Sequence, residues 1–352
     1  MIKLLDSSEE IDNGTSVEEE QFDIIFPYPL RFWLYFISFV ISLFWYIFVL
    51  LHMLLDRGLR QTLSNHTIIV LLIVNIIYEL ISIPMFLSYF HYHGVVYPST
   101  PATCLVWLFI DEGLFSVSLF LVAWASIERY ILIFHGQWVA TRRQQFLVHY
   151  LPLACLLIYL LVFYFFTITF PPCENDYEYN EIVCGSPLCY YDVPFFGLWD
   201  TIVLDIFPIL VIVIFNLALL FRVLIQKHRF NQRIEWRKYR KMTVQLLAIS
   251  CLYSLLHIPE MIVELIELIS GIEDYGAEFQ SYCKFFSYYT AFLLPVVTAV
   301  SLPNVKGKLS NIFLCRWKFT NENQAASATH GSSVAHRTNA IRPKTQQPSV
   351  PA

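Results

Sequence analysis

The chain has 352 residues, of which 57% are hydrophobic, 17% aromatic and only 14% charged, and its formal net charge is −5. Soluble domains carry about 25% charged residues, so most of this chain is not expected to face water. The composition excludes disorder, a coiled coil and a nucleic-acid partner for the bulk of the chain, and it predicts an integral membrane protein.

Seven apolar runs are long enough to cross a bilayer, which requires about 20 apolar residues in a helix. We place these runs at residues 30–55, 64–92, 104–134, 145–170, 194–224, 241–270 and 281–303. The sequence therefore predicts an all-α membrane protein, a seven-transmembrane helix bundle.

The basic residues are distributed unequally between the connections on the two sides of the membrane. Lys and Arg gather after the first, third and fifth runs and in the C-terminal tail, whereas the other connections and the N-terminal tail hold only Lys3, Arg31 and Lys284. Because positive residues stay on the cytoplasmic side, we expect the N-terminus outside and the C-terminus in the cytosol. The sequon Asn13-Gly14-Thr15 then lies outside, and we predict glycosylation of Asn13.

Four segments follow from this organisation. Residues 1–28 form an acidic extracellular tail, and residues 29–303 form the helix bundle. Residues 304–316 are predicted to be a short amphipathic helix on the membrane surface. Residues 317–352, rich in polar side chains and Pro, are predicted to be a disordered cytoplasmic tail.

The eight cysteines agree with this topology. Five fall at the outer side, where disulfides form: Cys104, Cys173, Cys184, Cys189 and Cys283. Two lie within helices and are expected only to pack: Cys155 and Cys251. Cys315, on the inner side, is a candidate for palmitoylation, with an unmodified thiol as the alternative.

The third run carries a motif at its inner end. It reads Glu128-Arg129-Tyr130, and Cys104 stands at the outer end of the same run, 25 residues before Arg129. This pair, at this spacing in the third of seven runs, resembles the rhodopsin-like (class A) family of G-protein-coupled receptors. The resemblance implies that Arg129 engages a G protein once the sixth helix swings outward. Glu128 can supply a counter-charge to Arg129, and a snorkelling arginine is the alternative.

Prolines add to the resemblance. They stand inside the second, fifth, sixth and seventh runs, where the family's helices also kink: Pro84, Pro208, Pro259 and Pro295. The resemblance assigns activation and coupling to Pro259 and Pro295 together with the motif at 128–130.

Other positions depart from the family pattern. His257 stands where the family has a tryptophan, and Thr298 ends the seventh-helix motif where the family has a tyrosine. Asn75 takes the place of the family's sodium-site aspartate, so no sodium pocket is expected. We therefore predict a divergent member of the family, whose activation route differs in detail.

The ligand pocket is predicted from acidic residues in the outer part of the bundle. Asp111 lies two helical turns below Cys104, where aminergic receptors of this family bind the ligand's ammonium group. Tyr288 lies seven residues before Pro295, where those receptors have a tyrosine bonded to that aspartate. A carboxylate inside a bundle is expected to face a water-filled cavity.

Further candidates lie at the same depth. Asp200 and Glu264 are expected to join the pocket, and Trp107 could form an aromatic wall that attracts a cation. The neighbouring Glu112, Asp205 and Glu260 are weaker candidates. The ligand is then a basic or amidated neuropeptide or a biogenic amine, and the surplus of acids favours the peptide. The alternative is that these acids bond only to neighbouring helices.

The resemblance also implies a disulfide from Cys104 to the loop after the fourth run. Cys189 and Cys184 are both possible partners, and Cys189 stands at a family-like distance before Pro208. In that arrangement Cys173 would pair with Cys184, and Cys283 has no assigned partner.

These features predict a multi-pass plasma-membrane receptor that activates a heterotrimeric G protein through the basic segment 226–241. Membrane lipids are further partners, and arrestin is a candidate partner. No catalytic motif is present, so we predict neither an enzyme nor a cofactor or metal. The alternative function is a membrane transporter or channel that uses intramembrane acids, which the absence of internal repeats disfavours.

Overall fold

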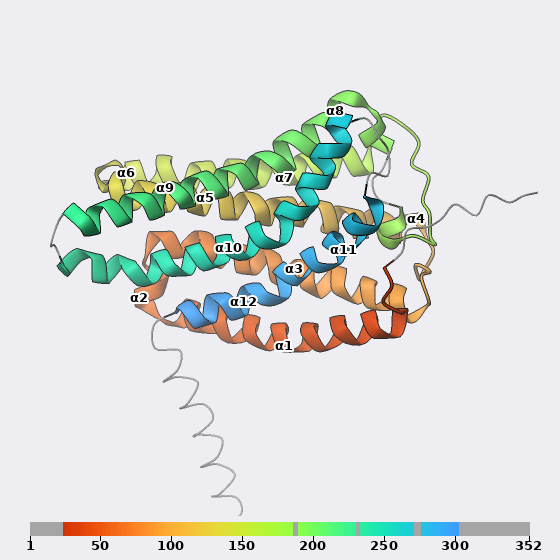
Figure 1. The fold of residues 1–352 in the computed structure, drawn as a ribbon, viewed down its shortest axis with the longest axis horizontal. Helices are drawn as coiled ribbons and strands as arrows, with labels where there is room; N and C mark the ends of the chain where they lie inside the picture. The colour runs from red at the N-terminus through yellow and green to blue at the C-terminus, as the bar shows by residue number, and fades with distance from the viewer. Residues whose placement is uncertain (1–23, 186–188, 230–232, 271–275, 303–352) are drawn as a thin grey trace, which may run out of the picture. The chain divides into compact units, whose positions relative to one another are not determined.

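The computed structural model describes residues 24–185, 189–229, 233–270 and 276–302. Every regular element in these ranges is helical. Seven helical segments of the described chain are long and apolar enough to cross a membrane, and they pack side by side in Figure 1. The predicted seven-helix bundle is therefore confirmed.

The first two spans are single helices. The helix α1 covers Tyr28–Leu55, and α3 covers Leu63–His91 with Pro84 inside it. The one-turn helix α2 (Arg57–Arg60) joins them, and the side chain of Asp56 caps it by accepting hydrogen bonds from the backbone N–H groups of Gly58 and Leu59. Such a cap satisfies donors that a helix start leaves open.

The third and fourth spans each contain a stretch of wider π-helix. The third runs through α4 (Pro101–Leu108), the π segment η1 (Phe109–Gly113) and α5 (Leu114–Phe134). The fourth runs through α6 (Arg142–Gln145), the π segment η3 (Phe146–Tyr150) and α7 (Leu151–Thr169). The short turn η2 (Gly136–Val139) connects the two spans.

The last three spans follow the outer loop. The fifth consists of α8 (Pro194–Trp199), the π segment η6 (Asp200–Ile206) and α9 (Phe207–Arg229). The sixth is α10 (Arg233–Ser270), which contains Pro259. The seventh is formed by α11 (Ala277–Ser287) and α12 (Tyr289–Ser301), with Pro295 inside α12.

The third span is the centre of the bundle. Its most apolar stretch is 67% buried, against 22% for α1. The helix α5 packs against α3, α7, α9 and α10, while α1 packs against α3 and α12. A side chain on the third span is therefore placed to contact most of the other helices.

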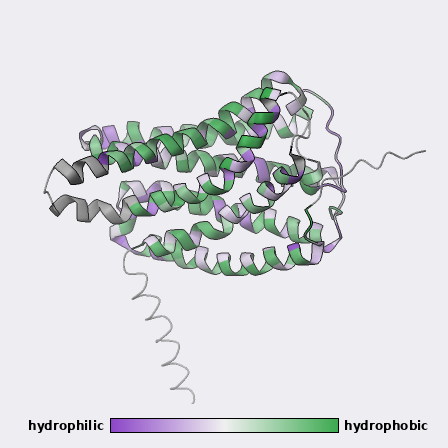
Figure 2. Ribbon diagram, in the orientation of Figure 1, coloured by the Kyte–Doolittle hydropathy of each residue, from purple (hydrophilic) through white to green (hydrophobic). Residues whose placement is uncertain are grey.

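The outward faces of the helices are apolar. Figure 2 shows hydrophobic residues along most of the bundle's helices, and large side chains such as Trp33, Phe44 and Ile158 are more than half exposed. Contiguous exposed apolar surface on this scale indicates contact with lipid rather than water.

The loop between the fourth and fifth spans carries two disulfides. One joins Cys104 to Cys184, and the other joins Cys173 to Cys189. Of the two partners left open for Cys104, Cys189 is therefore wrong and Cys184 is right. The described part of the chain leaves Cys155, Cys251 and Cys283 as free thiols.

Backbone hydrogen bonds explain this pairing. Glu178 N–H donates to Cys184 O, and Val96 N–H donates to Tyr179 O, which holds the turn η4 (Ile182–Cys184) over the start of α4. Cys189 already lies in the turn η5 (Cys189–Asp192) that leads into α8. Distance from Pro208 along the chain could not reveal which cysteine the loop folds onto α4.

Candidate functional site

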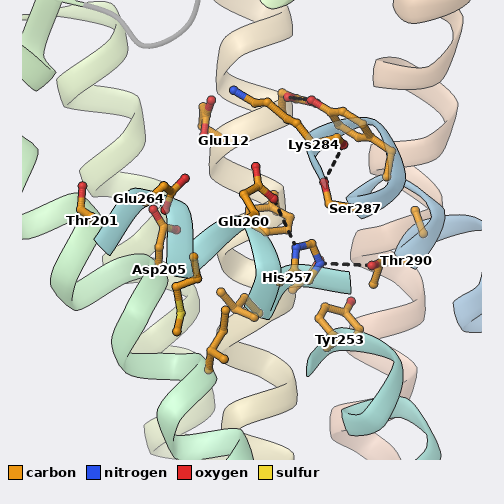
Figure 3. Close-up of a pocket in the computed structure, with 18 of the residues that line it drawn as sticks. Glu112, Thr201, Asp205, Tyr253, His257, Glu260, Glu264, Lys284, Ser287 and Thr290 are labelled. Atoms are coloured by element: carbon orange, nitrogen blue, oxygen red, sulfur yellow. Dashed lines mark hydrogen bonds and ion pairs between the residues drawn. The ribbon is translucent and has the colours of Figure 1, made fainter. Parts of the chain in front are cut away.

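A cavity of about 720 Å³ opens inside the bundle, at the end where the disulfide-bonded loop lies. Side chains from the second, third, fifth, sixth and seventh spans line it, and Tyr191 of the loop contributes to the wall. Figure 3 shows a close-up of this cavity. Its volume lies in the range typical of small-molecule and cofactor sites.

Acidic residues dominate the polar lining of this cavity. Six carboxylates line it: Asp111, Glu112, Asp205, Glu260, Glu264 and Glu267. Lys284 of α11 is the one lysine among the described lining residues, which include no arginine. The cavity therefore has a surplus of negative charge, which favours a cationic ligand in a site walled by low-dielectric helices.

Asp111 lies at the cavity with three hydrogen-bond donors around its carboxylate. Tyr78 Oη donates to Oδ1 over 2.9 Å, Ser82 Oγ donates to Oδ1 over 2.8 Å, and Tyr288 Oη donates to Oδ2 over 3.0 Å. The bond from Tyr288 is the one that the family resemblance implied. Asp111 is only 6% exposed, so these donors compensate for most of its lost hydration.

Asp200 does not line the cavity. It is 1% exposed, and its carboxylate accepts hydrogen bonds from Tyr164 Oη (2.7 Å) and Tyr190 Oη (2.9 Å). Tyr164 Oη also lies 2.7 Å from Ser116 Oγ. Asp200 therefore ties the third, fourth and fifth spans to the outer loop, and we correct its predicted placement as a cavity-lining residue.

Tyr190 lies outside the spans and is buried. Burial, together with the negative charge of Asp200, raises the pKa of the Tyr190 phenol well above its ordinary value. Its hydroxyl therefore remains protonated and able to donate to Asp200 at any physiological pH.

Trp107 is also absent from the cavity wall. Its indole is fully buried against Phe86, and its Nε1–H donates to Ser82 Oγ over 3.3 Å. Since Ser82 donates in turn to Asp111, Trp107 supports the Asp111 site from behind. Its predicted role as an aromatic wall of the pocket is therefore wrong.

Three of the outer acids lie in π segments. Asp111 lies in η1, and Asp200 and Asp205 lie in η6. An extra residue in a helical turn rotates the side chains that follow it, and such segments occur often at functional sites. Within η6, Asp205 lines the cavity while Asp200 does not.

His257 connects three helices beside the cavity. Its Nε2 atom lies 3.1 Å from Thr290 Oγ1 of α12, and its ring packs 4.9 Å from the ring of Phe115 on α5. Its Nδ1 atom lies 3.9 Å from Glu260 Oε2, one turn along α10 (Figure 3). His257 thus joins the sixth span to the third and seventh spans, two residues before Pro259.

At the opposite end of the bundle, Glu128 faces away from Arg129. Thr67 Oγ1 donates to Glu128 Oε2 over 2.7 Å, and His149 Nδ1 lies 2.8 Å from Glu128 Oε1. No ion pair joins Glu128 to Arg129 among the described residues, because adjacent residues on a helix point in different directions. Glu128 still acts electrostatically on the Arg129 guanidinium, so it supplies the expected counter-charge without a direct ion pair.

Arg129 itself is 4% exposed, and its Nη2 atom has no hydrogen-bond partner within the described residues. Tyr130 lies under a second arginine: the Arg222 guanidinium stands 5.2 Å from the Tyr130 ring and 4.8 Å from the Phe134 ring. These cation–π contacts fasten the inner end of α9 to α5.

The sequence alone did not single out several residues of these networks. Lys284, Tyr78 and Ser82 contribute to the cavity or to Asp111, and His149 contacts Glu128. Glu79 is fully buried and accepts a hydrogen bond from Ser42. A carboxylate inside an apolar run is a signal for a buried polar site, so Glu79 could have been found.

Some predicted sites lie outside the described residues. These are Asn13, Cys315, the amphipathic segment 304–316 and the tail 317–352. The helices α9 and α10 reach into the basic segment 226–241, but its side chains are not described. Within the described part of the chain, no group of His, Cys, Asp and Glu has the arrangement of a metal site.

Comparison with protein families gives one match. The family model described as 7 transmembrane receptor (rhodopsin family) matches residues 34–298, about three-quarters of the chain and all seven spans. A search of curated proteins finds no match. The family match confirms the resemblance seen at 128–130, and it favours a receptor over an enzyme, a transporter or a channel.

Proposed function

Since the chain belongs to the rhodopsin family of seven-transmembrane receptors, we propose that it binds an extracellular cationic ligand and activates a heterotrimeric G protein. The ligand class is a basic or amidated neuropeptide, or a biogenic amine. The receptor acts at the plasma membrane, with its N-terminal tail outside and its basic segments in the cytosol. Membrane lipids surround the bundle, and arrestin is a further partner.

One observation carries this proposal: the bundle encloses a cavity with six carboxylates and one lysine, at the end where the outer loop lies. A cation that enters would replace its hydration shell with carboxylate oxygens through charge-assisted hydrogen bonds. A neutral or anionic ligand would leave the surplus negative charge uncompensated. The acidic residues of the N-terminal tail and the outer loop would also attract a basic peptide toward the entrance.

The route from cavity to G protein is supported by contacts along the third and sixth spans. His257 of α10 lies at the cavity, one turn before Glu260, and also contacts α5 and α12. A ligand that repacks this region would shift the balance between two arrangements of α10. Movement of its inner end would then expose Arg129 of α5 to the G protein.

The first test is Asp111→Asn. Removing this charge while keeping the shape should reduce the potency of a cationic agonist by about tenfold to a hundredfold, because a hydrogen-bonded ion pair contributes about 1.5–3 kcal/mol. Agonists come from a screen of amines and short amidated peptides, read out by G-protein dissociation in cells. Glu278→Gln, an exposed acid outside the cavity, is the matched control. Unchanged potency in Asp111→Asn would contradict the proposed pocket.

The second test is Arg129→Gln. We expect it to abolish G-protein dissociation while surface delivery and ligand binding remain within about twofold of the wild-type protein, because Arg129 lies far from the cavity along α5. Surface immunostaining and binding of the agonist from the screen separate these effects. Full coupling by Arg129→Gln would argue against the role assigned to the motif at 128–130.

A further inference from the structure

The six acids of the cavity differ in the hydrogen-bond donors and cations that surround their carboxylates. Asp111 accepts hydrogen bonds from three side chains. Asp205 and Glu264, by contrast, accept no side-chain hydrogen bond and make no ion pair among the described residues. Glu260 has only the imidazole of His257, at 3.9 Å. Within the described residues, Asp205, Glu260 and Glu264 therefore have few groups that compensate a negative charge, so an added cation would stabilise them.

These three acids also act on one another. Glu260 and Glu264 are one helical turn apart on α10, and Figure 3 shows Glu264 beside Asp205 of η6. Asp205 is repelled electrostatically by both Glu264 and Glu260. Like charges inside a bundle repel far more strongly than in water, so such a group either takes up protons or gains from a positive charge that enters it.

A buried histidine points to the same place. His257 is 3% exposed, and its Nδ1 atom has no hydrogen-bond partner among the described residues. Figure 3 shows this atom directed toward Glu260, on the side of the cavity where Asp205 and Glu264 lie. An imidazole nitrogen buried without a partner costs free energy, which a ligand's hydrogen-bonding group at Glu260 would recover.

Lys284 does not fill this role. It attracts Glu264, but no ion pair between the two is formed within the described residues. Figure 3 shows its amino group extending toward Glu112 at the other side of the opening.

We propose that Asp205, Glu260 and Glu264 form a second cation subsite, distinct from Asp111, so that the ligand carries at least two positive groups. A guanidinium fits this subsite well, since its several N–H donors can serve three carboxylates at once. The proposal rests on the proposed function of the same cavity and specifies its ligand: a dication, such as a peptide end with a free amine and an arginine.

The test uses two pairs of probes that differ in one charge. They are hexanediamine against hexylamine, and arginine amide against N-acetylarginine amide. Binding to the purified full-length chain in phosphatidylcholine nanodiscs is measured by thermal shift. We expect each dication to bind at least about tenfold more tightly than its monocation, as a charged hydrogen bond predicts. Asp205→Asn combined with Glu264→Gln should reduce this ratio to about one, whereas Glu278→Gln should preserve it.

Other outcomes would overturn the subsite. They are equal affinities within a pair, no binding of either dication, or a ratio that survives the double substitution. If the double variant does not purify, Glu260→Gln provides the same comparison. A chain that binds dications without dissociating a G protein would contradict only the proposed function. Signalling lost in Asp111→Asn but unchanged in the double variant would contradict only the subsite.

Discussion

Asp111 and Asp200 show how neighbours decide what a buried carboxylate does. Both are acids in the outer part of a membrane span, and both are surrounded by tyrosine hydroxyls. Asp111 lines the cavity, while Asp200 is enclosed between three spans and the outer loop. Asp200 therefore stabilises the position of the loop that forms part of the cavity wall.

His257 provides a prediction at the same scale. Its bond to Thr290 crosses between α10 and α12, so His257→Ala and Thr290→Val should each lower the thermal midpoint of the purified protein. Because they break one shared bond, the double variant should fall no further than the worse single variant, with a coupling of about 1 kcal/mol.

A second pair of substitutions, at residues that share no hydrogen bond, controls for nonspecific destabilisation. Thr298 is buried in the same helix, but its hydroxyl bonds to Leu294 O of its own helix. His257→Ala and Thr298→Val should therefore lower the midpoint additively. If the His257 and Thr290 variants also add, the bond between them contributes nothing measurable.

Among the elements, α8 and the π segment η6 fix how the loop meets the bundle. Gly197 of α8 lies so close to the loop that a Cβ atom there would stand 2.3 Å from Tyr191 O. Tyr191 lines the cavity, and Asp200 follows three residues after Gly197. The absence of a side chain at Gly197 thus lets the loop approach the fifth span and close part of the cavity.

We therefore expect Gly197→Ala to displace the loop. Overpacking of this kind costs about 1–3 kcal/mol, so the thermal midpoint should fall and cationic agonists should lose potency. Gly136→Ala is the matched control, because a Cβ atom there would meet nothing within 4 Å. Equal midpoints for the two alanine variants would show that the loop backbone at Tyr191 can move away from the added Cβ atom without loss of stability.

For the whole molecule, the distribution of charge and apolar surface sets the topology. Seven apolar helices of the described chain are an odd number of candidate membrane crossings, so we expect residues 24 and 302 on opposite sides of a membrane. The cavity, with its surplus of acids, then lies toward the outside, and Arg129 and Arg222 lie toward the cytosol, where basic residues are favoured. In the proposed function, this separation lets ligand binding on one side of the membrane affect the G protein on the other.

Epitope tags test this arrangement. A tag before Met1 should be stained in intact cells, whereas a tag after Ala352 should be stained only after the membrane is permeabilised, because the chain crosses an odd number of times. Asn13→Gln should in addition increase gel mobility if the outer tail is glycosylated. Staining of both tags in intact cells would contradict the topology and with it the proposed function.

The seven spans and their family could be predicted from the sequence, because apolar length and the position of Glu128-Arg129-Tyr130 below Cys104 are properties of the chain alone. The bond between Tyr288 and Asp111 was implied by the family resemblance at those two positions. The signal for each span is local, since a membrane span needs only its own residues to satisfy its backbone.

Tertiary structure decided the rest. Asp200 and Asp205 have the same side chain five residues apart on the fifth span, yet only Asp205 lines the cavity, because Asp200 is enclosed by Tyr164 of the fourth span and Tyr190 of the outer loop. The partner of Cys104 depended on how the outer loop folds. Glu128 faces Thr67 and His149, which lie far from it along the chain, so only the packed bundle could bring them together.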